Sequence, residues 1–154
     1  MHIRLCAVGT RVPKWVTSGY EEYAKRLPRE HRLELYEVAA ADRRGGQAAD
    51  RWRREEAVRL RQAAAGARMV ALEVRGRALS TEALARLFDD WRMEGGDVAL
   101  IVGGADGIDP ALSKEASLRW SLSPLTLPHA LVRVVLAEQV YRAWTLISGH
   151  PYHR

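Results

Sequence analysis

The sequence predicts an α/β domain built on a mainly parallel sheet with helices on both faces. Strand-like and helix-like segments alternate from end to end, the pattern of parallel strands joined by helices. Residues 98–102 are apolar throughout, as in a strand covered on both faces. The chain has 154 residues, 47% hydrophobic and 28% charged, which suits a single folded domain over residues 1–154.

Five strands are expected from runs of apolar and β-forming residues bounded by turn residues. They cover residues 2–8, 32–38, 69–74, 98–102 and 118–122. The first ends at Gly9. The second alternates charged and apolar residues, which is typical of a strand with one exposed face, whereas the third is almost fully apolar.

Five helices are expected, each marked by residues that start or stop helices. They lie near 17–28, 50–66, 80–93, 109–116 and 130–148. Asp50 and Ser80 are expected N-caps, Pro110 fits a first turn, and Gly149 ends the last helix. Outward-facing arginines are expected on the second helix, namely Arg51, Arg53, Arg54, Arg59 and Arg61. The segment 39–49 has no period and two adjacent glycines, so we expect a mobile basic loop.

The last helix, 130–148, is apolar nearly all round its circumference. One sheet face of a small domain leaves part of such a helix uncovered, so we expect a homodimer interface there. Arg133, Glu138 and Arg142 interrupt it too often for a membrane span. No signal pattern precedes the first strand, so we expect a cytoplasmic protein with no membrane partner. The one cysteine, Cys6, excludes an internal disulfide and is expected to fill the core.

Charge is divided unevenly along the chain, whose formal net charge is +5. Residues 1–77 hold 17 Lys and Arg against 10 Asp and Glu, and residues 78–154 hold 7 against 9. A polyanion docking on the first half would explain this division. Arginines decorating solvated helix faces explain it equally well. Under the first interpretation, the RNA contacts are assigned to Arg43, Arg44, Arg51 and Arg54.

Ligands of parallel sheets bind at the carboxyl ends of the strands, where the turns after Val74, Val102 and Leu122 are expected. The Gly103-Gly104-x-x-Gly107 turn lets the backbone approach a ligand closely, although a plain turn is the alternative. Residues 121–128 are too apolar for a solvent loop, and they fit the wall of an adenine-binding pocket or a buried interface. The first strand ends in a lone glycine, which excludes a dinucleotide-binding fingerprint.

The chain ends in His150-Pro-Tyr-His-Arg154, a cluster of titratable side chains where chain ends are usually chemically inert. These groups are expected to reach a substrate. Metal binding is the competing interpretation, but two histidines without an acidic or thiol ligand nearby make a weak site, and no metal is expected. Glu138 and Arg142 stand one helical turn apart, in the favourable order for an ion pair.

Together these motifs resemble the ribosomal RNA large subunit methyltransferase H family. The resemblance covers the whole chain, and its motifs are Ala7–Thr10 with Trp15 and Tyr23, 103–107, 121–129, 131–133, 138–144 and 150–153. At Ala105-Asp106 many relatives carry a proline and a longer acidic or aromatic residue, so the role of Asp106 stays open. The family comprises SPOUT enzymes that use S-adenosylmethionine to methylate N3 of a pseudouridine in helix 69 of bacterial 23S rRNA.

The resemblance implies features that no periodicity predicts. They are a deep trefoil knot in a donor-binding part at about 68–154, a homodimer, and action on the assembled ribosome; general rules argue against any knot. It also implies the residues that hold the methyl donor, namely Leu72, Glu73, Gly103, Gly104, Leu122, Ser123, Pro124, Leu125, Thr126 and Leu127.

The reaction itself requires loss of the weakly acidic N3 proton. We expect Tyr152 and His153 to position the base and assist deprotonation, and Arg142 to favour the ring anion. Whether the tail acts in its own or the partner subunit stays open. One alternative is a non-catalytic ribosome-binding factor that uses the knotted fold as a dimer scaffold. A flavodoxin-like module that binds a phosphorylated ligand is another.

Overall fold

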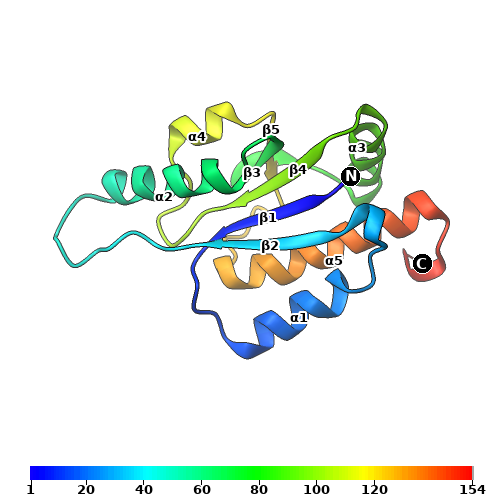
Figure 1. Cartoon of the computed structure of the whole chain (residues 1–154), viewed down its shortest axis with the longest axis horizontal. Coiled ribbons are helices and arrows are strands. Elements are labelled where there is room, and N and C mark those ends of the chain that lie inside the picture. Colours follow the sequence, from blue (N-terminus) through cyan, green and yellow to red (C-terminus); the bar gives the residue numbers. More distant parts are fainter. Residues whose placement is uncertain (154) are drawn as a thin grey trace.

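One parallel sheet organises the protein in a computed structural model that describes residues 1–153, with side chains for residues 1–152. The strands follow the order β2-β1-β4-β3-β5, and every neighbouring pair is parallel. They are β1 (Ile3–Val8), β2 (Leu33–Val38), β3 (Ala67–Ala78), β4 (Asp97–Val102) and β5 (Leu118–Ser121). Helices lie on both faces (Figure 1), so the predicted fold class is confirmed.

The helices are α1 (Lys14–Ala24), α2 (Ala49–Ala63), α3 (Thr81–Glu94), α4 (Pro110–Glu115) and α5 (His129–Ser148), with 3-10 turns η1 (Arg29–His31) and η2 (Pro151–His153). Figure 1 shows α2 and α4 over one face of the sheet, and α1 and α5 over the other. The first helix begins earlier than predicted, at Lys14, because Pro13 tolerates a helix start but not a helix interior. Within residues 1–153, none of the helices combines the length and apolar character that crossing a bilayer requires.

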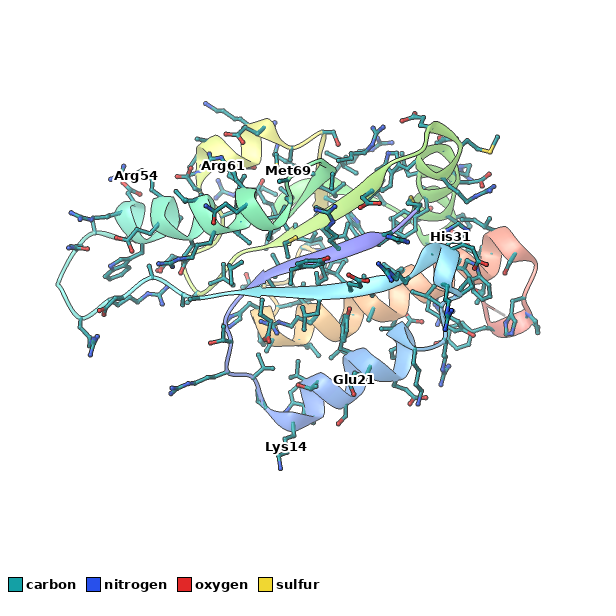
Figure 2. The ribbon with its side chains drawn as sticks, in the orientation of Figure 1. Lys14, Glu21, His31, Arg54, Arg61 and Met69 are labelled. Carbon is teal, nitrogen blue, oxygen red and sulfur yellow. The ribbon has the colours of Figure 1, made fainter. Side chains whose placement is uncertain are left out.

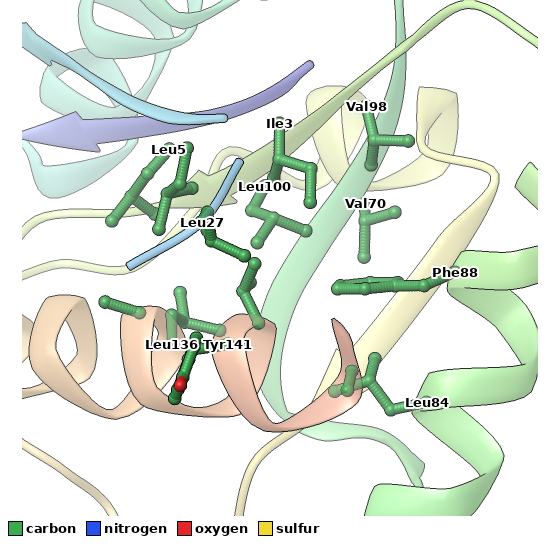
Figure 3. Packing of buried hydrophobic residues seen from close by; sticks show 14 of the residues in the cluster. Ile3, Leu5, Leu27, Val70, Leu84, Phe88, Val98, Leu100, Leu136 and Tyr141 are labelled. Atoms are coloured by element: carbon green, nitrogen blue, oxygen red, sulfur yellow. The ribbon is translucent and has the colours of Figure 1, made fainter. Parts of the chain in front are cut away.

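The sheet carries two separate cores because successive side chains of a strand point to opposite faces. Ile3, Leu5 and Ala7 belong to the larger core with α1, α3 and α5, part of which is drawn in Figure 3. Cys6 and Val8 belong to the smaller core with α2 and α4. Burial raises the pKa of the Cys6 thiol to about 11, in keeping with the predicted core filler.

Two predictions about α2 are wrong. The N-cap is Ala48, while Asp50 lies in the first turn, where a carboxylate also stabilises the helix start. Arg53 does not face outward: it forms an ion pair with Asp50 and donates to the carbonyl of Asp106, and these contacts hold it half-buried. Two further arginines of the helix are also half-buried, namely Arg59 and Arg61.

The last helix is covered by the sheet and by α1 and α3. Its buried side carries one charge, Arg133, which is 1% exposed. Arg133 donates to the Glu37 carboxylate and to the Gly9 carbonyl, both at 2.7 Å, and so ties α5 to the carboxyl ends of β2 and β1. Gly149 ends the helix with φ +74°, as predicted. Several apolar side chains stay partly exposed: Leu131, Val132, Val134, Val135, Trp144, Leu146 and Ile147.

Strand β3 runs past its predicted end because β5 pairs with it twice. Trp120 is opposite Leu72 and again opposite Arg77, and residues 73–76 leave the ladder between the two pairings. A Cβ at Gly76 would lie 2.8 Å from backbone atoms of Arg119 and Trp120, so only glycine fits this crossing. The excursion therefore directs residues 73–75 toward the carboxyl edge of the sheet.

Candidate active site

A cavity of about 780 Å³ lies at the ends of β4 and β5 and beside residues 72–75, where β3 leaves the ladder with β5. The turns expected after Val102 and Leu122 line it, because parallel neighbours bring their carboxyl ends to one edge. The turn expected after Val74 is instead an irregular part of β3, which continues to Ala78. Of the residues predicted to hold the methyl donor, all but Pro124 and Thr126 line it: Leu72, Glu73, Gly103, Gly104, Leu122, Ser123, Leu125 and Leu127. Pro124 and Thr126 lie between lining residues in the same loop.

The glycine turn after β4 is packed too closely for side chains. A Cβ at Gly103 would lie 2.6 Å from the carbonyl carbon of Gly107, and one at Gly104 would lie 2.9 Å from Val8 Cγ1. The Gly107 amide donates to the Gly104 carbonyl at 3.0 Å, with φ +81° at Gly107. Bare backbone therefore forms this part of the cavity wall, which is the surface that a close-fitting ligand needs.

The loop between β5 and α5 forms an apolar wall. The Ser121 hydroxyl donates to the Ser123 carbonyl at 3.1 Å, and the Leu125 amide donates to the Ser123 hydroxyl at 3.0 Å. These bonds shape the loop so that Leu122, Leu125 and Leu127 reach the cavity. Leu125 is 71% exposed, so its side chain is accessible to a ligand in the cavity.

Four polar residues that the sequence did not mark as ligand-binding also line the cavity. They are Arg53, Arg75, Asp106 and His129. Arg53 comes from α2, which packs on the sheet face beside the glycine turn, and His129 is the first residue of α5. A possible signal for Arg53 was its position one turn after Asp50, which pairs with it. Nothing local in the sequence marks Arg75 or His129.

The predicted catalytic side chains form a separate cluster at the end of α5. The Tyr152 hydroxyl donates to Glu138 Oε1 at 3.1 Å, and Arg142 Nε donates to the same oxygen at 2.7 Å. Burial, together with the Glu138 charge, raises the pKa of Tyr152 to about 12. Tyr152 is therefore a neutral hydrogen-bond donor at pH 7. The predicted role of His153 falls on a side chain outside the described residues.

Aromatic rings surround this cluster. Tyr141 lies 4.6 Å from Tyr152 and 6.0 Å from Trp144 between ring centroids. The guanidinium of Arg26 lies 5.9 Å from the Tyr152 ring centroid, and that of Arg142 lies 5.0 Å from it. Such cation–π contacts stabilise the tail against α5 and against the segment that follows α1.

The structure does not bring the tail cluster to the cavity within one chain. His129 lines the cavity at the first residue of α5, whereas η2 follows the last turn of the same helix. A helix of 20 residues is about 30 Å long. Figure 1 shows the last turn of α5, which η2 follows, away from the carboxyl edge of the sheet. A shared site therefore requires a second subunit or a large movement of the tail.

The arginines predicted to contact RNA differ in their surroundings. Arg43 bonds Asp106, with Nη2 at 2.5 Å and Nε at 3.1 Å from the carboxylate. Arg44 is exposed and pairs with Asp42 at 3.0 Å. Arg51 and Arg54 are exposed on α2, and Figure 2 shows Arg54 pointing away from the sheet. Among the side chains described, no three His, Cys, Asp or Glu residues are grouped to hold a metal ion.

The fold agrees with the family comparisons. A family model described as "Predicted SPOUT methyltransferase" matches residues 1–153, which places the chain among SPOUT methyltransferases. A solved structure, a probable methylase family protein from Haemophilus influenzae Rd KW20, superposes with a TM-score of 0.60 at 11% identity, covering 99% of this chain and 70% of that one. At this identity the structural likeness concerns the fold alone.

Relatives similar in sequence identify the family within the SPOUT methyltransferases. The ribosomal RNA large subunit methyltransferase H of Chromohalobacter salexigens is 54% identical over 157 residues, and that of Alcanivorax borkumensis 53% over 160, each covering 100% of both chains. That of Ralstonia nicotianae is 51% identical over 155 residues, covering 100% of this chain and 99% of the relative. The chain therefore belongs to the ribosomal RNA large subunit methyltransferase H family.

Proposed function

We propose that this protein uses S-adenosylmethionine to methylate N3 of a pseudouridine in helix 69 of bacterial 23S rRNA. It acts in the cytoplasm, as a homodimer, on the assembled ribosome. The observation that carries the proposal is the cavity at the ends of β4 and β5 and the irregular part of β3, which gathers most of the residues predicted for the methyl donor. Full-length relatives named as large-subunit rRNA methyltransferases support the choice of substrate.

The cavity fits the proposed donor. Its volume of about 780 Å³ lies within the range of ligand pockets, roughly 300–1,000 Å³. The leucines of the loop after β5 suit the face of an adenine ring, and the bare glycine turn admits close backbone contact. Glu73, at the excursion of β3, faces the same cavity and suits a cationic ligand. When bound, S-adenosylmethionine supplies an electrophilic methyl group on a good leaving group, and no metal is required.

The protein's own task is to position the base and remove its N3 proton. Tyr152 positions the ring, because its raised pKa keeps the hydroxyl protonated and its bond to Glu138 fixes its direction. His153 accepts the proton near neutral pH. Arg142 is held beside the phenol by Glu138 and stabilises the anionic ring.

A homodimer would reconcile the cavity with the distant tail. The half-exposed apolar side chains of α5 continue along the helix to the tail cluster, and a second copy packed there would cover them. The tail of one subunit then reaches the cavity of its partner. The RNA surface comprises Arg44, Arg51 and Arg54 on the basic half of the chain, whereas Arg43, the fourth arginine predicted to contact RNA, is bonded to Asp106.

The decisive experiment is methyl transfer from labelled S-adenosylmethionine to purified ribosomes, with the modified nucleoside located by mass spectrometry. We expect transfer to assembled ribosomes, much less to separated large subunits, and none to RNA that lacks the pseudouridine. A folded protein that binds the donor but transfers no methyl group to ribosomes would refute the proposed reaction. A protein that binds ribosomes without calorimetric heat from the donor would instead be the non-catalytic scaffold.

A further inference from the structure

The segment between β2 and α2 is attached to the glycine turn of the cavity through one arginine. Both Nη2 and Nε of Arg43 donate to one carboxylate oxygen of Asp106, at 2.5 and 3.1 Å. Asp106 lines the cavity, and residues 103–107 form the turn of which it is part. Two nitrogens on a carboxylate define direction as well as distance, so Arg43 restrains the position of the turn.

Two residues of helix α2 also contact Arg43 and Asp106. The Arg43 guanidinium lies 5.2 Å from the ring centroid of Trp52. Arg53 donates to the Asp106 carbonyl at 3.2 Å. Trp52 and Arg53 thus hold the arginine and the aspartate from the first two turns of the same helix.

A buried carboxylate, that of Glu56, lies beside Arg43 and the glycine turn. Glu56 is 1% exposed; its Oε2 accepts the Ala41 amide at 3.0 Å and lies 3.8 Å from Arg43 Nη2. Its Oε1, which has no partner among the described residues, would lie 3.6 Å from a Cβ at Gly104. Glu56 therefore bonds the segment that carries Arg43 and lies beside the turn that Arg43 holds, and it leaves Arg43 between two carboxylates.

We propose that Arg43 is a positioning residue of the donor cavity, acting through Asp106 on the glycine turn, and not primarily a contact for RNA phosphates. The proposal rests on the function proposed above, since it concerns the affinity for S-adenosylmethionine. Arg44 also pairs with a carboxylate, that of Asp42, but its side chain is 92% exposed. The Arg43 side chain is 35% exposed and lies between two carboxylates, so it has less to offer a phosphate than Arg44. Loss of Arg43 releases the turn and weakens donor binding.

The test is a double-mutant cycle on the full-length protein, with the donor Kd measured by calorimetry. Arg43→Gln and Asp106→Asn should each weaken donor binding by about three- to tenfold, and the double variant no further, because each single change breaks the same contact. Arg43→Lys should recover only part of the affinity, since an ammonium lacks the paired donors. Arg61→Gln breaks a comparable ion pair with Glu115 outside the cavity and should leave the donor Kd unchanged.

Steady-state kinetics distinguish the two roles of Arg43. Positioning raises the KM for the donor and leaves the KM for ribosomes unchanged, whereas an RNA contact does the reverse. A wild-type donor Kd retained in Arg43→Gln, or additive effects in the double variant, would overturn the inference. A wild-type protein with no heat from S-adenosylmethionine would instead refute the proposed function itself, so the two failures are distinguishable.

Discussion

The cavity at the first residue of α5 and the tail cluster at its last turn differ in the groups that form them. At its first residue the cavity wall combines the bare backbone of a glycine turn with the leucine side chains of the loop after β5. At its last turn the cluster consists of polar side chains bonded to one another, with Glu138 accepting from both Tyr152 and Arg142. Backbone and leucine side chains give the cavity a close-fitting surface for a ligand, whereas the tail cluster supplies groups that can assist proton transfer. Donor binding and chemistry should therefore fail separately when each end is altered.

The largest effect is expected at the cavity end. Gly103→Ala places a methyl group 2.6 Å from the Gly107 carbonyl carbon, so the turn must shift, at a cost of about 1–3 kcal/mol in unfolding free energy and with loss of donor binding. Calorimetry and urea denaturation measure both. Gly45→Ala is the matched control, because its Cβ would meet only the flexible Gln47 side chain at 3.4 Å. Unchanged donor affinity in Gly103→Ala would remove the turn from the site.

A change in the tail cluster, at the last turn of α5, should lower turnover without weakening donor binding. His153→Ala is expected to lower kcat by about 100-fold, as for loss of a general base, with the donor Kd unchanged. Single-turnover methyl transfer to ribosomes measures this. Coexpression with Gly103→Ala subunits sharpens the comparison: mixed dimers should regain activity if each tail serves the partner's cavity. Activity that stays at the level of the inactive parents would place tail and cavity in the same subunit.

Charge reversal on the basic surface should weaken ribosome binding without altering the donor cavity or the tail cluster. Replacing Arg44, Arg51 and Arg54 by Glu is expected to weaken ribosome binding by about tenfold or more and to reduce its salt dependence, because fewer counterions are released. Donor affinity should stay at the wild-type value in calorimetry. Wild-type ribosome binding across a salt series would place the RNA surface elsewhere.

The smallest effect concerns alkaline stability. The pKa of Tyr152 is raised to about 12, so between pH 10 and 12 the folded state holds a proton that the unfolded state has lost. Its contribution to the free energy of unfolding is therefore complete below pH 10 and declines as pH rises toward 12. Chemical denaturation should show the unfolding free energies of wild type and Tyr152→Phe converging as the pH rises toward 12. A difference between the two free energies that stays constant over this range would show that the folded state does not raise the pKa of Tyr152.

The sequence predicted most of the sheet because its signals are local. The apolar run 98–102 predicted a strand covered on both faces, and those residues are buried in β4. Ser80 predicted a helix start, which the structure confirms through a 3.1 Å bond from the Ala83 amide. Asp50 was misassigned as a cap because a carboxylate in the first turn and one at the N-cap are favoured for similar electrostatic reasons. The extra length of β3 was missed because residues 73–76 leave the ladder and then rejoin it.

The amino-acid order by itself determined the alternation of strands and helices, the glycine turn and the apolar loop after β5, since each depends on spacing between near neighbours. Only the tertiary structure decided that Arg43 meets Asp106, that Arg53 turns inward, and that the tail lies a helix length from the cavity. Those relations depend on strand order and helix direction, through which residues more than 50 positions apart come into contact. Local periodicity carries no information about which distant segments become neighbours.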